Sequence, residues 1–439
     1  MDPADPKEGN LPDILQAGSL HEFLQELHDK YGPIASFWRG TQYTISIASP
    51  DLFKEQQHVF DRPANLYASL ETLLTEKSIQ FANGPSARHR RTMLDKYFTA
   101  DSVATYYGTL HKLSKELSEK WASLPANQHI PLEQHMMALA VKMFLKVAYG
   151  FYFNDDRQVL AFKKNYDLAW HELESWVSGT TPEPGSEREK VFLDARDSMF
   201  ALIEAAMKHR EDHAPTSGGG DRLFLDVLRD PDNEMDADVR TADALTYAVG
   251  GMHTTGIALT WAIYFLASHE DIQEKLCKEL KDQLGDSVMS PQEFSDSSYL
   301  RQVIDETLRC AIIGPHAARV QDFDSKLGGH IVPKNTPVIQ ALGVVMHDEK
   351  IWPEPNKFDP ERFSSENSKG RSSYAFQPYG FAGKRICPGY RLANAEIGVA
   401  LSELCRRFKF HLVAGQVVQP VHGLVTRPKD EVWITISKR

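Results

Sequence analysis

The strongest constraint on the fold is a helical pattern that runs almost unbroken from about residue 85 to residue 310. Within it, the residues from about Asp238 to Ser268 predict a single helix roughly 45 Å long at 1.5 Å per residue. The apolar part after Thr255 has only about 13 residues, whereas a membrane span needs ~18 to 20. The pattern therefore predicts a mainly α-helical protein whose longest helix is not a membrane span.

Short β-like runs flank this helical core. The first two, near residues 34–48, read as a hairpin, and the tail within 409–439 has strand character. Further runs are expected at Ala317 to Gln321, His330 to Val332 and Val338 to Ile339. Helices are also expected to start near Ser19 and directly after Gly389, and Ala214 to Gly220 reads as a mobile surface loop. Because no Pro/Gly/Ser-rich linker divides the chain, one domain over residues 1–439 is predicted.

Composition narrows the function classes. The chain has 49 Lys and Arg against 60 Asp and Glu, a net charge of −11, which argues against nucleic acid as a partner. None of the four cysteines forms a C-x-x-C pair, so neither a zinc ribbon nor a disulfide framework is expected. The N-terminal residues have no basic, apolar leader, so the chain as given predicts neither a signal peptide nor a membrane anchor.

The sharpest chemical feature is a glycine-punctuated loop from Gly380 to Gly389 that delivers Cys387 to the start of a helix. A helix N-terminus and nearby cations favour a thiolate, and Lys384 and Arg385 are the cations at hand. The glycines let the backbone fold closely beneath a flat group. Taken alone, the pattern is only suggestive, because a free cysteine is more often an inert buried residue.

In the order of its motifs, the whole chain resembles the cytochrome P-450 superfamily of haem-thiolate monooxygenases. Gly383, Arg385, Cys387 and Gly389 fall on the signature positions of that family's haem-binding loop, within an expected haem-binding region at 358–408. The resemblance implies a helical bundle around haem b, with Cys387 as the axial iron ligand. The signature opens with Phe then Gly, whereas this chain has Gly380 then Phe381, so Tyr379 and Phe381 both remain candidates for the aromatic beside the sulfur.

Two further motifs support the resemblance. Glu306 and Arg309 are spaced i, i+3 on a helix, ordinarily a solvated pair. With Arg362 they match the family's buried Glu-Arg-Arg network, which implies a structural role in locking the cysteine loop. The Gly250-to-Thr255 run resembles the oxygen-activating motif of the long helix, with Gly251 and Thr254 on family positions.

His253 stands where the family carries Asp or Glu to deliver protons. Its ordinary pKa of about 6.5 is compatible with a proton relay. Three interpretations stay open: a working substitute in the relay, a residue pointing into the substrate pocket, or a core histidine.

The haem propionates need cationic partners. By resemblance these are Arg91, Arg319 and Arg385, while Ala87 replaces a tryptophan that the family uses for the same purpose. Arg88, Arg90 and Lys96 form either a solvated basic face or a docking patch for an acidic electron donor. Residues 66–79, 170–176 and 312–318 are placed by resemblance around the substrate pocket.

The N-terminal and C-terminal segments resemble the animal branch numbered family twenty, an orphan group. The resemblance implies a monomeric monooxygenase that acts on a small lipophilic substrate, with electrons from NADPH through a cytochrome reductase and with cytochrome b5 as a further partner. It also implies an anchor ahead of this start and a place at the endoplasmic reticulum membrane, facing the cytosol. The alternatives are a haem-thiolate isomerase or dehydratase of pre-oxidised lipids, and a non-catalytic haem-binding sensor.

Overall fold

The computed structural model describes residues 1–177, 179–213, 222–233, 235–380, 383 and 385–439. The predicted loop at Ala214 to Gly220 lies outside these residues, as do Phe381 and Lys384.

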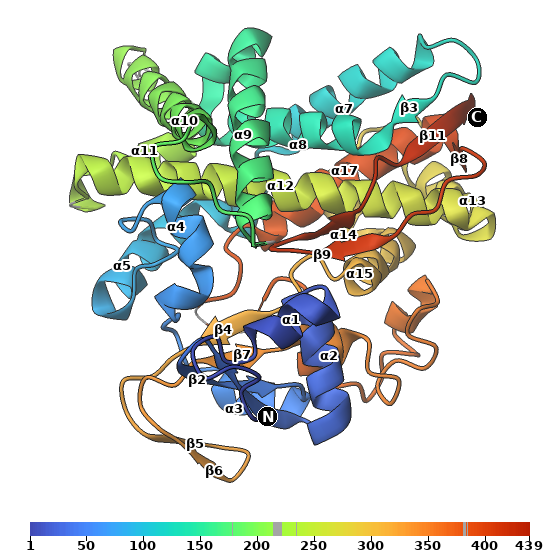
Figure 1. The fold of residues 1–439 in the computed structure, drawn as a ribbon. Coiled ribbons are helices and arrows are strands. Elements are labelled where there is room, and N and C mark those ends of the chain that lie inside the picture. Colours follow the sequence, from blue (N-terminus) through green and yellow to red (C-terminus); the bar gives the residue numbers. More distant parts are fainter. Residues whose placement is uncertain (178, 214–221, 234, 381–382, 384) are drawn as a thin grey trace.

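Helices dominate the described chain, as predicted (Figure 1). The α-helices are α1 Leu11–Ala17, α2 Leu20–Tyr31, α3 Pro50–Gln56, α4 Ala68–Leu74, α5 Gly84–Leu94, α6 Ala100–Ala104, α7 Tyr107–Ala122, α8 Leu132–Tyr149, α9 Asp156–Val177, α10 Glu187–Asp212, α11 Phe224–Leu228, α12 Ala237–Ser268, α13 Glu270–Leu284, α14 Pro291–Asp296, α15 Ser298–Ala311, α16 Leu342–Met346 and α17 Tyr390–Arg407. The 3-10 helices are η1 Ala64–Tyr67, η2 Asp95–Phe98, η3 Gly150–Asn154, η4 Pro231–Asn233, η5 Pro360–Phe363 and η6 Ser373–Ala375.

The strands are short and form four small sheets. They are β1 Ile34–Arg39, β2 Gln42–Ile47, β3 Ile130–Pro131, β4 Ala317–Arg319, β5 Ser325–Leu327, β6 His330–Val332, β7 Val338–Gln340, β8 Phe408–Leu412, β9 Pro420–His422, β10 Thr426–Pro428 and β11 Trp433–Lys438. The largest sheet has the order β1-β2-β7-β4. The expected hairpin at 34–48 is its β1–β2 pair, and β2 runs parallel to β7, with Ile45 opposite Val338.

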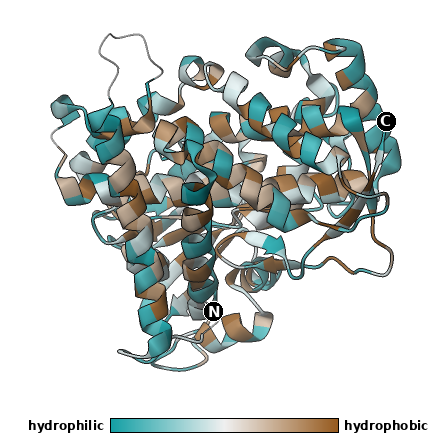
Figure 2. Ribbon diagram, turned by 90° about the horizontal axis from the view of Figure 1, so that it is seen from above, coloured by the Kyte–Doolittle hydropathy of each residue, from teal (hydrophilic) through white to brown (hydrophobic). Residues whose placement is uncertain are grey.

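The long predicted helix is α12, which crosses the middle of the molecule beside α8 (Figure 1). Two glycines let these helices approach closely. A Cβ on Gly251 would lie 2.2 Å from the Phe144 ring, and one on Gly256 would lie 2.4 Å from the Met137 sulfur. Apolar residues line the central helices while hydrophilic residues cover much of the outer ones (Figure 2).

Local signals account for the helix ends near the site. The Ser19 side chain caps α2 by accepting from the Glu22 backbone N–H, as the predicted start requires, and α17 begins at Tyr390, directly after the cysteine loop. In the described chain, one segment, Leu132–Asn154, is long and apolar enough to cross a membrane, and 72% of its apolar window is buried.

Candidate haem-thiolate site

A cavity of about 410 Å³ lies between α12 and the cysteine loop. It brings together residues that are far apart in the sequence, including Cys387, Thr254 and His253. The three pocket segments predicted from the sequence also reach it, through Tyr67, Leu70, Leu74, Ile79, Trp170, Ile313, Gly314, His316 and Ala317. Apart from the arginines described below, the wall around these residues is mainly apolar.

The cysteine loop has the tight backbone that its glycines predict. Gly383 has φ of 113°, and a Cβ there would lie 2.4 Å from the Gln57 carbonyl oxygen, so no larger residue fits. Gly389 lines the cavity, and a Cβ on it would meet nothing within 4 Å of the described residues. The cavity is therefore open on the side formed by the cysteine loop, which is called its floor below. The loop closes where the Cys387 N–H donates to the Tyr379 carbonyl at 3.0 Å. Tyr379 therefore lies beside the cysteine, whereas Phe381 lies outside the described residues.

Opposing effects act on the Cys387 thiol, which is exposed to the cavity. Burial within the protein raises its pKa, while the Gly389 backbone N–H and the guanidinium groups of Arg91 and Arg62 lower it. The stabilising cations are thus Arg91 and Arg62, whereas Arg385 turns toward the carbonyls of Ile79 and Ala82. A metal bound to the sulfur would complete its deprotonation.

The three arginines predicted to hold propionates all line the cavity. Arg91 donates to Asp95 at 2.8 Å and to the Ile386 carbonyl at 2.7 Å, which ties α5 to the cysteine loop. Arg319 donates to the carbonyls of Val59 and Ala318. Arg385 keeps two nitrogens, Nε and Nη1, without a hydrogen-bond partner among the described residues.

Arg62 is a fourth cavity arginine that sequence reasoning missed. Its Nε also lacks a partner within the described part of the chain. Burial and the neighbouring arginines lower the pKa of Arg385 to about 8 and that of Arg319 to about 9. Since guanidinium groups stay protonated in proteins, we interpret these shifts as the cost of burial, with repulsion added to it, and an anionic ligand would relieve both. A sulfur donor, an open floor and clustered cations fit a flat dianionic group such as haem.

The motif on α12 keeps an unbroken helix. The hydroxyl of Thr254 donates to the Gly250 carbonyl at 2.9 Å, and that of Thr255 donates to the Gly251 carbonyl at 3.1 Å. Thr254 and Gly250 both line the cavity. Gly251, predicted as a catalytic position, is also the point where α12 contacts Phe144 of α8, so helix packing alone requires a glycine there.

His253 is buried against α9. Its imidazole lies 4.2 Å from the Trp170 ring and 5.8 Å from the Tyr166 ring, measured between centroids. Burial, followed by the charge of Arg427, lowers the pKa of His253 to about 3, so the ring is neutral at pH 7. Neither ring nitrogen has a hydrogen-bond partner among the described residues. His253 thus lines the cavity as a neutral imidazole, and a relay through it would have to start from that neutral form.

Glu396 is a second residue that sequence reasoning missed. It lies on α17, lines the cavity and is 1% exposed. Neither carboxyl oxygen has a partner of normal geometry in the described chain, although the Thr255 hydroxyl faces it. Burial raises the pKa of Glu396 well above its ordinary value, and the Thr255 hydroxyl offsets this only in part, so the environment favours the protonated carboxyl. The only signal in the sequence is a glutamate among apolar residues of the helix that follows Cys387, and Glu403 gives the same signal seven residues later.

The Glu306 network forms as predicted. Arg309 donates to both oxygens of Glu306, at 2.7 and 2.9 Å, and Arg362 Nε lies 3.3 Å from Glu306 Oε1. The side chains of Glu306 and Arg309 are fully buried. Arg309 also donates to the carbonyls of Met346 and Pro355, so the network joins α15 to the segment before η5.

The predicted basic face requires a correction. Arg90 is only 11% exposed at its side chain and forms an ion pair with the buried Asp243 of α12. It therefore belongs to the scaffold, because a buried carboxylate needs a cationic partner. Arg88 and Lys96 are exposed, as expected.

Comparison with known proteins agrees with this geometry. The family model for Cytochrome P450 matches residues 4–434, so the chain belongs to the cytochrome P450 family of haem-thiolate monooxygenases. Among its relatives, Cytochrome P450 20A1 of Homo sapiens is 35% identical over all of this chain and 92% of its own length. Cytochrome P450 20A1 of Bos taurus is 36% identical over the same shares.

The fold is also that of a solved cytochrome P450 structure. A crystal structure titled as the heme domain of cytochrome P450DA superposes with a TM-score of 0.85 and 20% identity. The match covers 100% of this chain and 96% of that one. The predicted fold class is thus confirmed.

Proposed function

We propose that this chain holds haem b through Cys387 and inserts one oxygen atom of O₂ into a small lipophilic substrate. The observation that supports this most directly is one cavity shared by the Cys387 sulfur, four arginines and the Thr254 hydroxyl. Arg62, Arg91, Arg319 and Arg385 would hold the propionates. When bound, the haem would supply O₂ activation with electron donation from the thiolate.

The protein's own groups would manage water and protons. The Thr254 hydroxyl can exchange its bond to the Gly250 carbonyl for one to a small polar molecule in the cavity. The neutral His253 can accept a proton at one nitrogen and release one from the other. The apolar wall, which includes Leu70, Leu74 and Ile313, would exclude polar substrates.

The proposal extends to partners and location. Electrons would come from NADPH through a cytochrome reductase, with cytochrome b5 as a further donor, to a monomer at the cytosolic face of the endoplasmic reticulum. Similarity to Cytochrome P450 20A1 proteins and the exposed Arg88 and Lys96 on the α5 side support this.

A second candidate is an isomerase or dehydratase of lipid hydroperoxides, which needs no protonation of O₂. His253 favours it, because this neutral imidazole stands at the usual position of an acid and has no hydrogen-bond partner in the part of the chain that the structure describes.

Two assays separate the candidates. The reduced protein with carbon monoxide should first show the red-shifted Soret band of a thiolate ligand, and Cys387→Ser should abolish it. A monooxygenase consumes O₂ with NADPH and reductase in the presence of lipophilic compounds. Turnover of lipid hydroperoxides without reductase, and no O₂ consumption, would instead establish the second candidate. If the protein binds haem tightly but shows activity in neither assay, it would be a haem-binding sensor.

Replacing His253 by aspartate tests its role in proton delivery. Because Asp restores a residue that ionises more readily, we expect the fraction of NADPH use coupled to product to rise in His253→Asp. His253→Asn is the matched control, since it fills a similar volume without ionising. Equal coupling in the wild type and both variants would remove residue 253 from the relay.

A further inference from the structure

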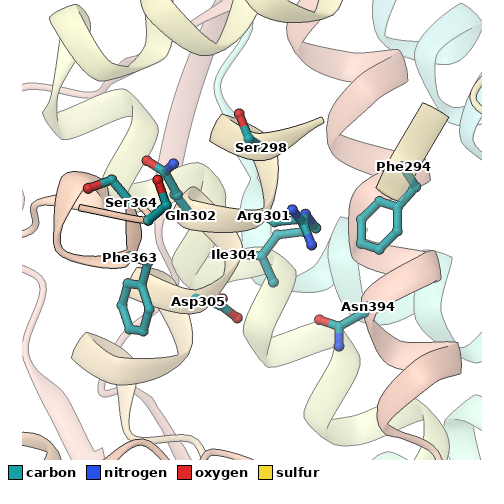
Figure 3. Close-up of a pocket in the computed structure, with 10 residues that line it drawn as sticks. Phe294, Ser298, Arg301, Gln302, Ile304, Asp305, Phe363, Ser364 and Asn394 are labelled. Atoms are coloured by element: carbon teal, nitrogen blue, oxygen red, sulfur yellow. The ribbon is translucent and has the colours of Figure 1, made fainter. Parts of the chain in front are cut away.

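A second pocket, of about 420 Å³, lies on the other side of α17 from Glu396. Its walls come from α14, α15, the end of η5 and α17 (Figure 3). The aromatic rings of Phe294 and Phe363 stand at its sides, and Ile304 supplies an apolar surface. Polar groups, including Arg301, Asp305 and Asn394, occupy the space between them.

The pocket contains opposite charges that are not paired with each other. Arg301 and Asp305 are spaced i, i+4 on α15, a spacing that commonly gives an ion pair. Among the described residues no nitrogen–oxygen contact within 4.0 Å joins them, so the charge of Arg301 acts on Asp305 only from a longer distance. The buried Gln302 Oε1 also lacks a hydrogen-bond partner among the described residues. Burial raises the pKa of Asp305 to about 7, and the charge of Arg301 offsets this rise only in part.

We propose that this pocket binds a small zwitterion of the α-amino acid class, with its carboxylate on Arg301 and its ammonium group on Asp305 and Gln302. A ligand with only one charge would leave Arg301 or Asp305 unpaired. The side chain of the amino acid would lie between Phe294 and Phe363, where an apolar or aromatic group finds complementary surface.

Such a ligand would act on the thiolate site through the scaffold. Asn394 accepts a hydrogen bond from the Tyr379 hydroxyl at 3.0 Å, and the Tyr379 carbonyl accepts from the Cys387 N–H. Asp305 and Phe363 adjoin Glu306 and Arg362, two members of the buried network. Occupation of the pocket would therefore stabilise the cysteine loop and slow the loss of haem.

The test uses calorimetric titration of the haem-loaded protein, with an imidazole ligand saturating the haem cavity. The probes are L-phenylalanine, L-phenylalanine amide and N-acetyl-L-phenylalanine, which carry both charges, only the ammonium and only the carboxylate. Because each derivative loses one charged contact, it should bind at least about tenfold more weakly than the zwitterion. The zwitterion should also slow haem transfer to apomyoglobin.

Two variants assign the contacts. Arg301→Gln should weaken L-phenylalanine binding about tenfold without changing the affinity of the amide, and Asp305→Asn should weaken it without changing the affinity of the N-acetyl compound. Arg157→Gln is the matched surface control, because Arg157 is exposed and is not among the residues that line the pocket. Equal affinity for the three probes, absence of binding at millimolar concentration, or an unaffected Arg301→Gln variant would each overturn the proposal.

Discussion

The buried carboxyl of Glu396 lowers the stability of the folded protein whenever it is ionised, because its charge is removed from water. Its oxygens have no normal hydrogen-bond partner in the described chain, and burial raises its pKa. The folded protein holds the proton more tightly than the unfolded chain, in which the carboxyl has its ordinary pKa. The stability contributed by this proton is complete below the unfolded pKa and is lost as the pH rises toward the folded pKa.

Replacing Glu396 by glutamine should therefore have a pH-dependent effect. We expect Glu396→Gln to be more stable than the wild type at a pH of about 8, and the difference to shrink toward a pH of about 4, where the unfolded carboxyl is also protonated. Thermal unfolding across this range measures the effect, with the exposed Glu116→Gln as control. A constant difference at all pH values would show that Glu396 has an ordinary pKa in the folded protein.

At the scale of elements, the contact between α8 and α12 depends on Gly251, whose neighbour Gly250 lies outside that contact. A Cβ on Gly251 would enter the Phe144 ring, whereas one on Gly250 would meet nothing within 4 Å. Gly251→Ala should lower the free energy of unfolding by about 1 to 3 kcal/mol through overpacking. Gly250→Ala is the matched control and should raise it by up to about 1 kcal/mol through helix propensity. Urea unfolding measures the free energy of unfolding of both variants. Equal changes in the two variants would contradict the packing argument.

The link between α15 and η5 depends on a buried charge. Glu306→Gln leaves Arg309 and Arg362 without a carboxylate, so we expect a loss of about 3 to 5 kcal/mol and a lower haem content in the purified protein. Lys275→Met, which removes an exposed ion pair with Glu361, should cost less than about 1 kcal/mol. Similar losses in the two variants would mean that the buried network contributes no more than a surface pair.

For the whole molecule, four arginines from separate segments converge on one cavity and repel one another without an anionic ligand. Haem at a thousandfold excess over Kd should therefore add about 4 kcal/mol to the free energy of unfolding of the apoprotein, which would raise its melting temperature strongly. Haem dimethyl ester, which lacks the two negative charges, should restore only a small part of this gain. Equal melting temperatures with haem and its ester would show that the arginines do not contact the propionates.

The sequence predicted those parts of the site that lie within continuous motifs. The Cys387 loop, the α12 motif and the pair of Glu306 and Arg309 could be identified because their spacing along the chain fixes their geometry. Arg62 and Glu396 could not, since only the tertiary fold brings Arg62 to the Cys387 loop and Glu396 to Thr255. Arg90 was misassigned for the same reason, because its partner Asp243 is 153 residues away.

The parallel pairing of β2 with β7 also constrains how the molecule is made. Residues 45–47 pair with β1 on one side, but their other side is paired only by residues 338–340, so the largest sheet stays incomplete until most of the polypeptide has left the ribosome. The consecutive helices between them can collapse earlier through contacts close in sequence. During synthesis the outer side of β2 in the N-terminal hairpin is thus an unpaired edge, and chaperone dependence should concentrate there.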